Sequence, residues 1–151
     1  MNFFFQKLID QATDDGVQKL SIAGVIIHDQ KLLVLKRLPD DFMPNIYELP
    51  GGGLECNETL LDALYREIKE ETSCIIDHIV GYVGYIDFPS SSGKLTRRFN
   101  FLVKPKTPFL ITLSEHADYA WISPEDADNY DITVQTKGII ACVKENKIHY
   151  L

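Results

Sequence analysis

The chain has 151 residues, 45% of them hydrophobic and 25% charged, which is the composition of an ordinary globular domain with a proper core. Its formal net charge of −7 argues against nucleic-acid binding by bulk electrostatics, so we expect no stable nucleic-acid partner. A small polyanionic substrate is still compatible with this charge, because a bound metal ion reverses the local sign.

The cysteines and the N-terminus indicate the compartment. Cys56, Cys74 and Cys142 form no CxxC pair, which is typical of free thiols in a reducing environment. No basic leader precedes the short apolar run Phe3–Phe5, so the start does not have the pattern of a signal peptide. No apolar run approaches the roughly 18 residues of a membrane-spanning helix. We therefore expect a cytoplasmic protein without a membrane partner.

The first part of the chain predicts a helix and two strands. Residues 3–14 place apolar side chains at helical spacing, and this helix would pack on the domain or on a partner subunit, which is compatible with a homodimer. We assign residues 1–19 as a helical extension of one domain that spans 1–151. The β-branched run 20–27 predicts a buried strand, and residues 32–35 predict the strand that returns beside it.

A glycine turn and a second helix follow. Residues 38–45 predict a loop, residues 46–49 a short strand and residues 50–53 a turn. Thr59, with Asp62 three residues later, resembles a capping box at the start of a helix. The helical pattern continues to residue 72.

The second half predicts more strands and a last helix. Strand character is found at residues 75–76, 79–88, 98–103 and 119–122. Residues 89–94 predict a hairpin loop, Ser123 and Pro124 a helix start, and residues 133–145 a C-terminal helix. Strands and helices alternate, but hairpins interrupt any all-parallel pattern. We therefore predict an α/β (α+β) fold with a mixed sheet between helices.

Three glutamates gather on one face near the end of the second helix. Glu67, Glu70 and Glu71 fall within an arc of roughly 100°, because successive helical residues are about 100° apart. Like charges at this spacing repel by roughly 0.2–0.5 kcal/mol per pair, and acids near a helix C-terminus cost roughly 0.3–1 kcal/mol each. This unfavourable arrangement indicates a cation site, and Mg²⁺ prefers such oxygen ligands. An EF-hand calcium site is disfavoured, since the acids lie on a helix and not in a loop.

The glutamates belong to a longer pattern. Gly52 is followed after five residues by Glu58 and after seven more by the run Arg66–Thr72, and Glu48–Gly51 precede the pattern. This spacing closely resembles the Nudix box, and most of the chain is similar to a MutT-like Nudix hydrolase. The resemblance implies a single Nudix domain, built as an α/β/α sandwich with a mixed sheet between helices.

Two residues depart from the box. Asn57 stands where the family has glycine before its first glutamate, and Ser73 stands where glycine usually closes the helix. Glycine at such points serves a positive φ, which Asn tolerates well and Ser less well. Cys74 replaces an aliphatic residue, which is a mild change. Every charged position of the box is present, so the departures do not predict an inactive enzyme.

The resemblance implies Mg²⁺-dependent hydrolysis of a diphosphate bond in a nucleoside diphosphate linked to a group X, with Mn²⁺ as an alternative metal. The implied metal ligands are Glu67, Glu70, Glu71 and the backbone carbonyl of Gly52 or Gly51. Glu58 and Arg66 would support these ligands, Arg66 by orienting a carboxylate. Phosphoryl transfer requires charge neutralisation and a positioned water more than covalent chemistry from the protein, which agrees with such a site.

The sequence leaves the general base and the phosphate ligands open. Glu70 is one candidate base, and Glu115 is the other, because the family often supplies a base from a loop at this place; a solvated acid explains Glu115 equally well. Arg37, Arg97 and Arg98 are the candidate cations for substrate phosphates, although each is at least as well explained as a surface arginine.

Three functions are compatible with these residues. A nucleoside triphosphate or modified nucleotide is the preferred substrate, and ADP-ribose or a nucleotide sugar is the alternative. Pro89, fifteen residues after Cys74, resembles a proline of some ADP-ribose-cleaving members, but a hairpin loop favours proline in any case. A catalytically silent nucleotide-binding module is the third function, which the complete glutamate set argues against.

Overall fold

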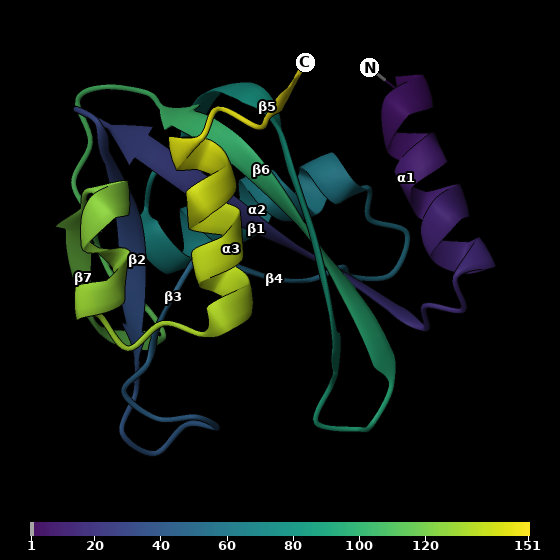
Figure 1. The fold of residues 1–151 in the computed structure, drawn as a ribbon, viewed down its shortest axis with the longest axis horizontal. Coiled ribbons are helices and arrows are strands. Elements are labelled where there is room, and N and C mark those ends of the chain that lie inside the picture. The colour runs from purple at the N-terminus through teal and green to yellow at the C-terminus, as the bar shows by residue number, and fades with distance from the viewer. Residues whose placement is uncertain (1) are drawn as a thin grey trace.

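In the computed structural model, which describes residues 2–151, a mixed β-sheet lies between helices on both of its faces (Figure 1). The elements in chain order are α1 (Asn2–Asp14), β1 (Lys19–His28), β2 (Lys31–Arg37), β3 (Tyr47–Glu48), β4 (Gly51–Gly53), α2 (Leu60–Thr72), β5 (Ile76–Pro89), β6 (Leu95–Pro105), β7 (His116–Ile122), the 3₁₀ helix η1 (Pro124–Asn129), α3 (Val134–Lys144) and β8 (His149–Tyr150). The α+β class and the mixed sheet predicted from the sequence are confirmed.

The sheet is mixed because hairpins alternate with one parallel crossover. The strand order is β3-β2-β1-β6-β5-β8, with β4 beside β1 and β7 beside β2. Strands β1 and β6 run parallel, whereas the pairs β1–β2, β1–β4, β2–β7 and β5–β6 are antiparallel. Strand β1 therefore lies at the centre, with β4 on one side of its first half and β6 on the other.

Two apolar clusters cover the two faces of the sheet. Along β1, Ile22 and Ile26 pack towards α1 and α2, whereas Ala23 and Val25 pack towards α3 and η1. A strand that is buried on both faces has no polar alternation, which is why residues 20–27 form a continuous apolar run. In Figure 1, α3 lies in front of the sheet and α2 behind it.

The N-terminal helix packs on the domain itself. Phe5 and Ala12 of α1 are buried in the same cluster as Leu64 and Ile68 of α2. Of the two partners that the sequence allowed for this helix, the structure therefore shows the domain, and the homodimer stays a prediction. No helix within residues 2–151 is long and apolar enough to cross a membrane.

Some local predictions were wrong. Gly51–Gly53 form strand β4, which pairs with residues 21–23 of β1, and not a turn; the chain turns later, at residues 56–57. Residues 76–89 form one long strand, whose register shifts absorb the break expected near residue 77. The short strand β8 was not predicted, because two residues give no periodicity to detect.

Both ends of α2 follow from its sequence. The Thr59 side chain accepts a hydrogen bond from the backbone N–H of Asp62, as an N-cap should. Ser73 ends the helix in the left-handed region with φ of 63°, and its N–H donates to the carbonyl of Lys69. Asn57 also has a positive φ, of 62°. The two residues that replace family glycines therefore adopt the glycine-type conformation.

We expect the substitution Ser73→Gly to raise the free energy of unfolding by about 1 kcal/mol, because glycine removes the steric cost of the left-handed conformation. Urea denaturation of the purified protein would measure the change. Lys69→Gly, on the exposed face of the same helix, is the control and should lower stability by about 1 kcal/mol. A loss of stability in Ser73→Gly would contradict the backbone argument.

Candidate active site

A cleft of about 400 Å³ opens where β1 begins and where β4 leads into α2. Its walls come from β1, β4, the end of β2, the β5–β6 hairpin and the start of β7. The cleft brings together five residues that the sequence analysis singled out and that are far apart in the chain: Arg37, Gly52, Glu71, Arg98 and Glu115.

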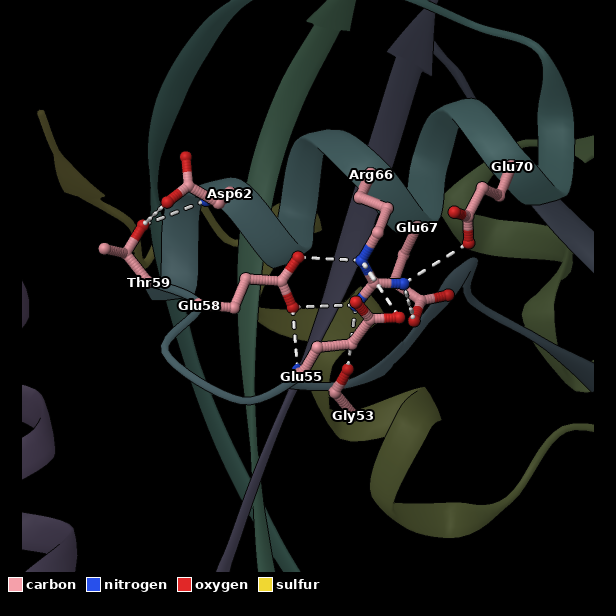
Figure 2. Close-up of polar contacts among 8 residues, drawn as sticks. All are labelled: Gly53, Glu55, Glu58, Thr59, Asp62, Arg66, Glu67 and Glu70. Atoms are coloured by element: carbon pink, nitrogen blue, oxygen red, sulfur yellow. Dashed lines mark hydrogen bonds and ion pairs between the residues drawn. The ribbon is translucent and has the colours of Figure 1, made fainter.

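Arg66 connects the acids of the box. Its guanidinium donates to both carboxylate oxygens of Glu58, at 2.7 and 2.8 Å, and Nη1 donates to Glu67 at 2.7 Å and to Glu70 at 3.3 Å. Nη2 also reaches the carbonyl of Gly53 at 3.1 Å, and Figure 2 shows the side chain at the centre of this group. The hydrogen bonds from Arg66 hold the pKa of Glu58 at about 2. Arg66 thus fixes the carboxylates and the strand together.

The glycines of β4 allow the helix acids to approach the strand. A Cβ atom on Gly52 would overlap the carboxylate of Glu67, and the N–H of Gly51 donates to Glu71 Oε2 at 2.8 Å. Glycine is therefore required here for close approach, not for a turn. Glu67 and Glu71 lie directly against the backbone of β4 as a result.

Glu71 is the buried acid of the site, with 7% of its surface exposed. Burial raises its pKa to about 7, against the opposing effect of the Gly51 hydrogen bond. No ion pair within residues 2–151 involves this carboxylate. A buried carboxylate without a cationic contact favours either a proton or a bound cation.

The donor types at this place suit a divalent metal. Glu67 and Glu71 offer hard oxygen donors beside the carbonyl groups of β4, and Glu70 is exposed on the next position of the helix. As placed here, no three His, Cys, Asp or Glu side chains within residues 2–151 converge closely enough to hold a metal. Arg66 contacts Glu67 and Glu70 instead. The ligand set named from the sequence therefore stays a prediction.

A second polar network lies on the opposite wall of the cleft. Glu48 contacts His116 Nε2 at 2.8 Å and Arg37 Nη1 at 3.3 Å, and Arg37 also pairs with Asp41 at 3.0 Å. Burial opposes the charged form of His116, but Glu48 and nearby Glu71 raise its pKa overall. The Nε of Arg37 and the Nδ1 of His116 are buried without a hydrogen-bond partner. Both atoms therefore have unused hydrogen-bonding capacity in the wall of the cleft.

Arg98 and Ser21 line the cleft on the face of the sheet that α3 covers. The Nε of Arg98 donates to Asn100 and its Nη2 donates to Thr136, and burial lowers its pKa. Ser21 is paired with Arg98 across strands β1 and β6, and its hydroxyl is buried without a partner. The floor of the cleft therefore carries donors that the protein itself does not use fully.

Arg97 does not line this cleft, so the structure contradicts the prediction that it binds substrate phosphates. Its guanidinium is buried and pairs with Asp87 at 2.7 Å and with Asp15 at 2.8 Å, while it also covers the ring of Tyr85. Neighbouring residues of a strand point to opposite faces. Because Arg98 faces α3, Arg97 must face the other side, where it holds α1 to the β5–β6 hairpin.

The two candidate bases occupy different positions. Glu115 is exposed at the mouth of the cleft, directly before β7, and Glu70 is exposed on α2. The Ser114 hydroxyl donates to the backbone carbonyl of Glu70 at 2.8 Å, which joins the two segments. The structure thus brings both candidates to the same region, and the choice between them stays a prediction.

Sequence reasoning missed three residues of the cleft. Glu48 was noted only as part of the segment before the box, yet it connects Arg37 with His116. His116 follows Glu115 in the chain, and Ser21 sits within an apolar strand, so neither has a distinctive pattern of its own. A polar residue inside a buried strand was the one signal that could have identified Ser21.

Known proteins resemble this chain in sequence and in fold. An ADP-ribose pyrophosphatase of Methanocaldococcus jannaschii is 45% identical over 56 residues, which are 37% of this chain and 32% of that protein. The nucleoside triphosphatase NudI of Escherichia coli is 28% identical over 130 residues, covering 80% of this chain and 92% of that protein. The structure of a MutT protein of Methanosarcina mazei Go1 shares the fold, with a TM-score of 0.74 at 23% identity over 85% of this chain and 95% of that one.

The family itself is shown by a match to most of the chain. The model of the NUDIX domain matches residues 18–141, which run from the start of β1 into α3 and include every residue of the cleft. The glycine strand, the acidic helix and their contacts lie at the centre of this match. The chain therefore belongs to the Nudix hydrolase family, whose members act on nucleoside diphosphate derivatives.

Proposed function

We propose that this protein hydrolyses a diphosphate bond in a nucleoside diphosphate linked to a group X and that it uses Mg²⁺, with Mn²⁺ as an alternative. The observation that carries the proposal is the buried Glu71 carboxylate beside Glu67 on the glycine strand, which forms no ion pair within the described residues. Across the cleft lie Arg37 and Arg98, whose charges suit a polyanionic substrate.

Each residue of the box has a distinct task in this proposal. Glu67, Glu70 and Glu71, with the carbonyl of Gly52, would hold the metal, which would neutralise charge on the phosphate oxygens and lower the pKa of the attacking water. Arg66 and Glu58 fix the orientation of Glu67 through the hydrogen bonds described above. Gly51 donates to Glu71 and keeps this carboxylate against the strand.

The substrate phosphates would lie between the acidic helix and Arg37. Glu48 and Asp41 orient Arg37, whose guanidinium lines the cleft and would bring its charge near the phosphate oxygens. The general base would be Glu115, which is exposed at the mouth of the cleft, or Glu70, which is exposed on α2 directly before Glu71.

A nucleoside triphosphate or modified nucleotide is the preferred substrate. The NudI relative, whose name states a nucleoside triphosphatase, matches nearly its whole length, whereas the match to the ADP-ribose pyrophosphatase is confined to 56 residues. ADP-ribose or a nucleotide sugar is therefore the alternative. The remaining alternative is a silent nucleotide-binding module, and release of phosphate or pyrophosphate from a substrate panel would decide against it.

We expect Glu71→Gln to lower kcat by at least about 100-fold, because it removes one charged oxygen donor of the proposed metal site. Phosphate or pyrophosphate release with Mg²⁺ and with Mn²⁺ measures the effect, and circular dichroism checks the fold. Glu125→Gln, an exposed acid on η1, is the matched control and should keep full activity. The metal mechanism would be refuted if the unmodified protein stays active in EDTA and the Glu71→Gln variant stays active with Mg²⁺.

Substitution of the true general base should lower kcat by about 100- to 10,000-fold and remove the acidic limb of the pH–rate profile. Glu115→Gln and Glu70→Gln separate the two candidates, since only one of them should alter the profile in this way. If both variants retain the profile of the unmodified protein, neither residue is the base.

The burial of Glu71 also predicts a pH dependence of stability without metal. Because its folded-state pKa of about 7 exceeds the ordinary value, the folded protein binds more protons than the unfolded chain between roughly pH 4.5 and 7. The free energy of unfolding therefore falls as the pH rises through this window. At pH 8 in EDTA, Glu71→Gln should be more stable than the unmodified protein by on the order of 2 kcal/mol.

Thermal melts at pH 5 and pH 8 would measure this difference. The advantage of Glu71→Gln should shrink at pH 5, where Glu71 is protonated in the folded protein, and Mg²⁺ at pH 8 should stabilise the unmodified protein more than the variant. A difference that is the same at both pH values would show that burial of the charge is not its cause.

A further inference from the structure

Arg98 is a largely buried cation whose contacts are all neutral. Its Nε donates to Asn100 Oδ1 at 3.2 Å and its Nη2 donates to Thr136 Oγ1 at 3.0 Å, and no ion pair within residues 2–151 involves it. A guanidinium carries five N–H donors in a fixed fork and no acceptor. Both N–H groups of Nη1 and one of Nη2 therefore have no partner among the described residues.

Ser21 is the neighbour of Arg98 in the sheet. In the sheet, Ser21 is paired with Arg98 of β6 on one side and with Gly53 of β4 on the other. The serine is 7% exposed and its buried hydroxyl has no hydrogen-bond partner. Both residues line the cleft, and each has hydrogen-bonding groups that no described residue uses.

The strand register gives the distance of this pair from the box. Neighbouring strands lie about 4.8 Å apart, so the backbone of Arg98 is about 10 Å from that of Gly53. Glu67 and Glu71 contact the β4 residues next to Gly53. A diphosphate bond that is cleaved beside β4 would therefore leave Arg98 near a remote part of the substrate and not near the cleaved phosphates.

The surroundings of Arg98 suit a planar base. Phe88 of β5 is paired with Thr96, two residues from Arg98 on the same face of β6, and both line the cleft. An aromatic side chain beside hydrogen-bond donors is the usual arrangement for holding a nucleobase by its face and its edge. The guanidinium has no acceptor of its own, so it requires acceptors on the base.

Oxopurines match this requirement better than adenine. Guanine and hypoxanthine present N7 and O6 acceptors side by side, whereas adenine presents N7 beside an amino donor that would oppose the guanidinium. We propose that Arg98 and Ser21 bind the acceptor edge of an oxopurine packed against Phe88, so that the substrate is a guanine or hypoxanthine nucleotide. The inference rests on the proposed diphosphate hydrolysis and adds the base that the enzyme selects.

The nucleotides ITP and ATP test the proposal, because they carry an oxo and an amino group at the same position of the purine. The unmodified protein should show a kcat/KM about 10- to 100-fold higher for ITP, the range expected of a good bidentate contact. Arg98→Met should lower the ITP/ATP ratio of kcat/KM to about 1. Arg98→Lys, which keeps the charge but not the fork, should also lose most of the preference.

The neighbouring arginine of the same strand provides the control. Arg97→Met removes the neighbouring arginine on the opposite face, so it should lower the melting temperature but retain the ITP/ATP ratio. If Arg98 instead binds phosphate, both nucleotides will lose activity equally in Arg98→Met and the ratio will not change. An unchanged ratio, or an unmodified protein without preference for ITP, overturns the proposal.

Calorimetric binding of IMP and AMP separates this inference from the proposed hydrolysis. Tighter binding of IMP that is lost in Arg98→Met supports base selection even if no nucleotide of the panel is cleaved. Conversely, cleavage of both triphosphates at equal rates, with equal binding of the two monophosphates, supports the hydrolysis and refutes the base selection.

Discussion

The close approach of α2 to strand β4 is the constraint on which the site depends. Side chains on Gly51 and Gly52 would overlap the backbone of β1 and the carboxylate of Glu67, respectively. Without those side chains, two glutamates of the helix reach the strand, and one of them accepts a backbone hydrogen bond there. The number of residues between the glycines of β4 and the glutamates of α2 follows from this geometry. The loop after β4 must reverse the chain so that α2 passes over these glycines.

The same approach concentrates negative charge, and the protein neutralises only part of it. Arg66 donates hydrogen bonds to three acids and to the strand, which keeps Glu58 ionised and Glu67 oriented. Glu71 receives one neutral hydrogen bond and is buried, so its charge is costly in the folded protein. The arrangement therefore favours a bound cation at the edge of the cleft. The arginines on the far walls favour a negatively charged ligand, such as a phosphate group that binds together with a metal ion.

The predictable features were those in which the local sequence decides the structure. Thr59 and Ser73 marked the ends of α2 because caps and left-handed residues have local causes. Strand β4 could not be recognised, since three glycines acquire their strand character only from the pairing with β1. Arg97 and Arg98 were equivalent in the sequence, and the alternation of the strand separated a structural arginine from one that lines the cleft.

The buried Arg97 has a consequence for how the cleft can vary. It joins Asp15, just after α1, to Asp87, which directly precedes Phe88 in the wall of the cleft. Helix α1 lies outside the region that matches the family, so the hairpin is braced by a segment that the common domain does not include. A relative with a different N-terminal segment must support this wall in another way. The shape of the substrate cleft can therefore diverge through residues that never contact a substrate.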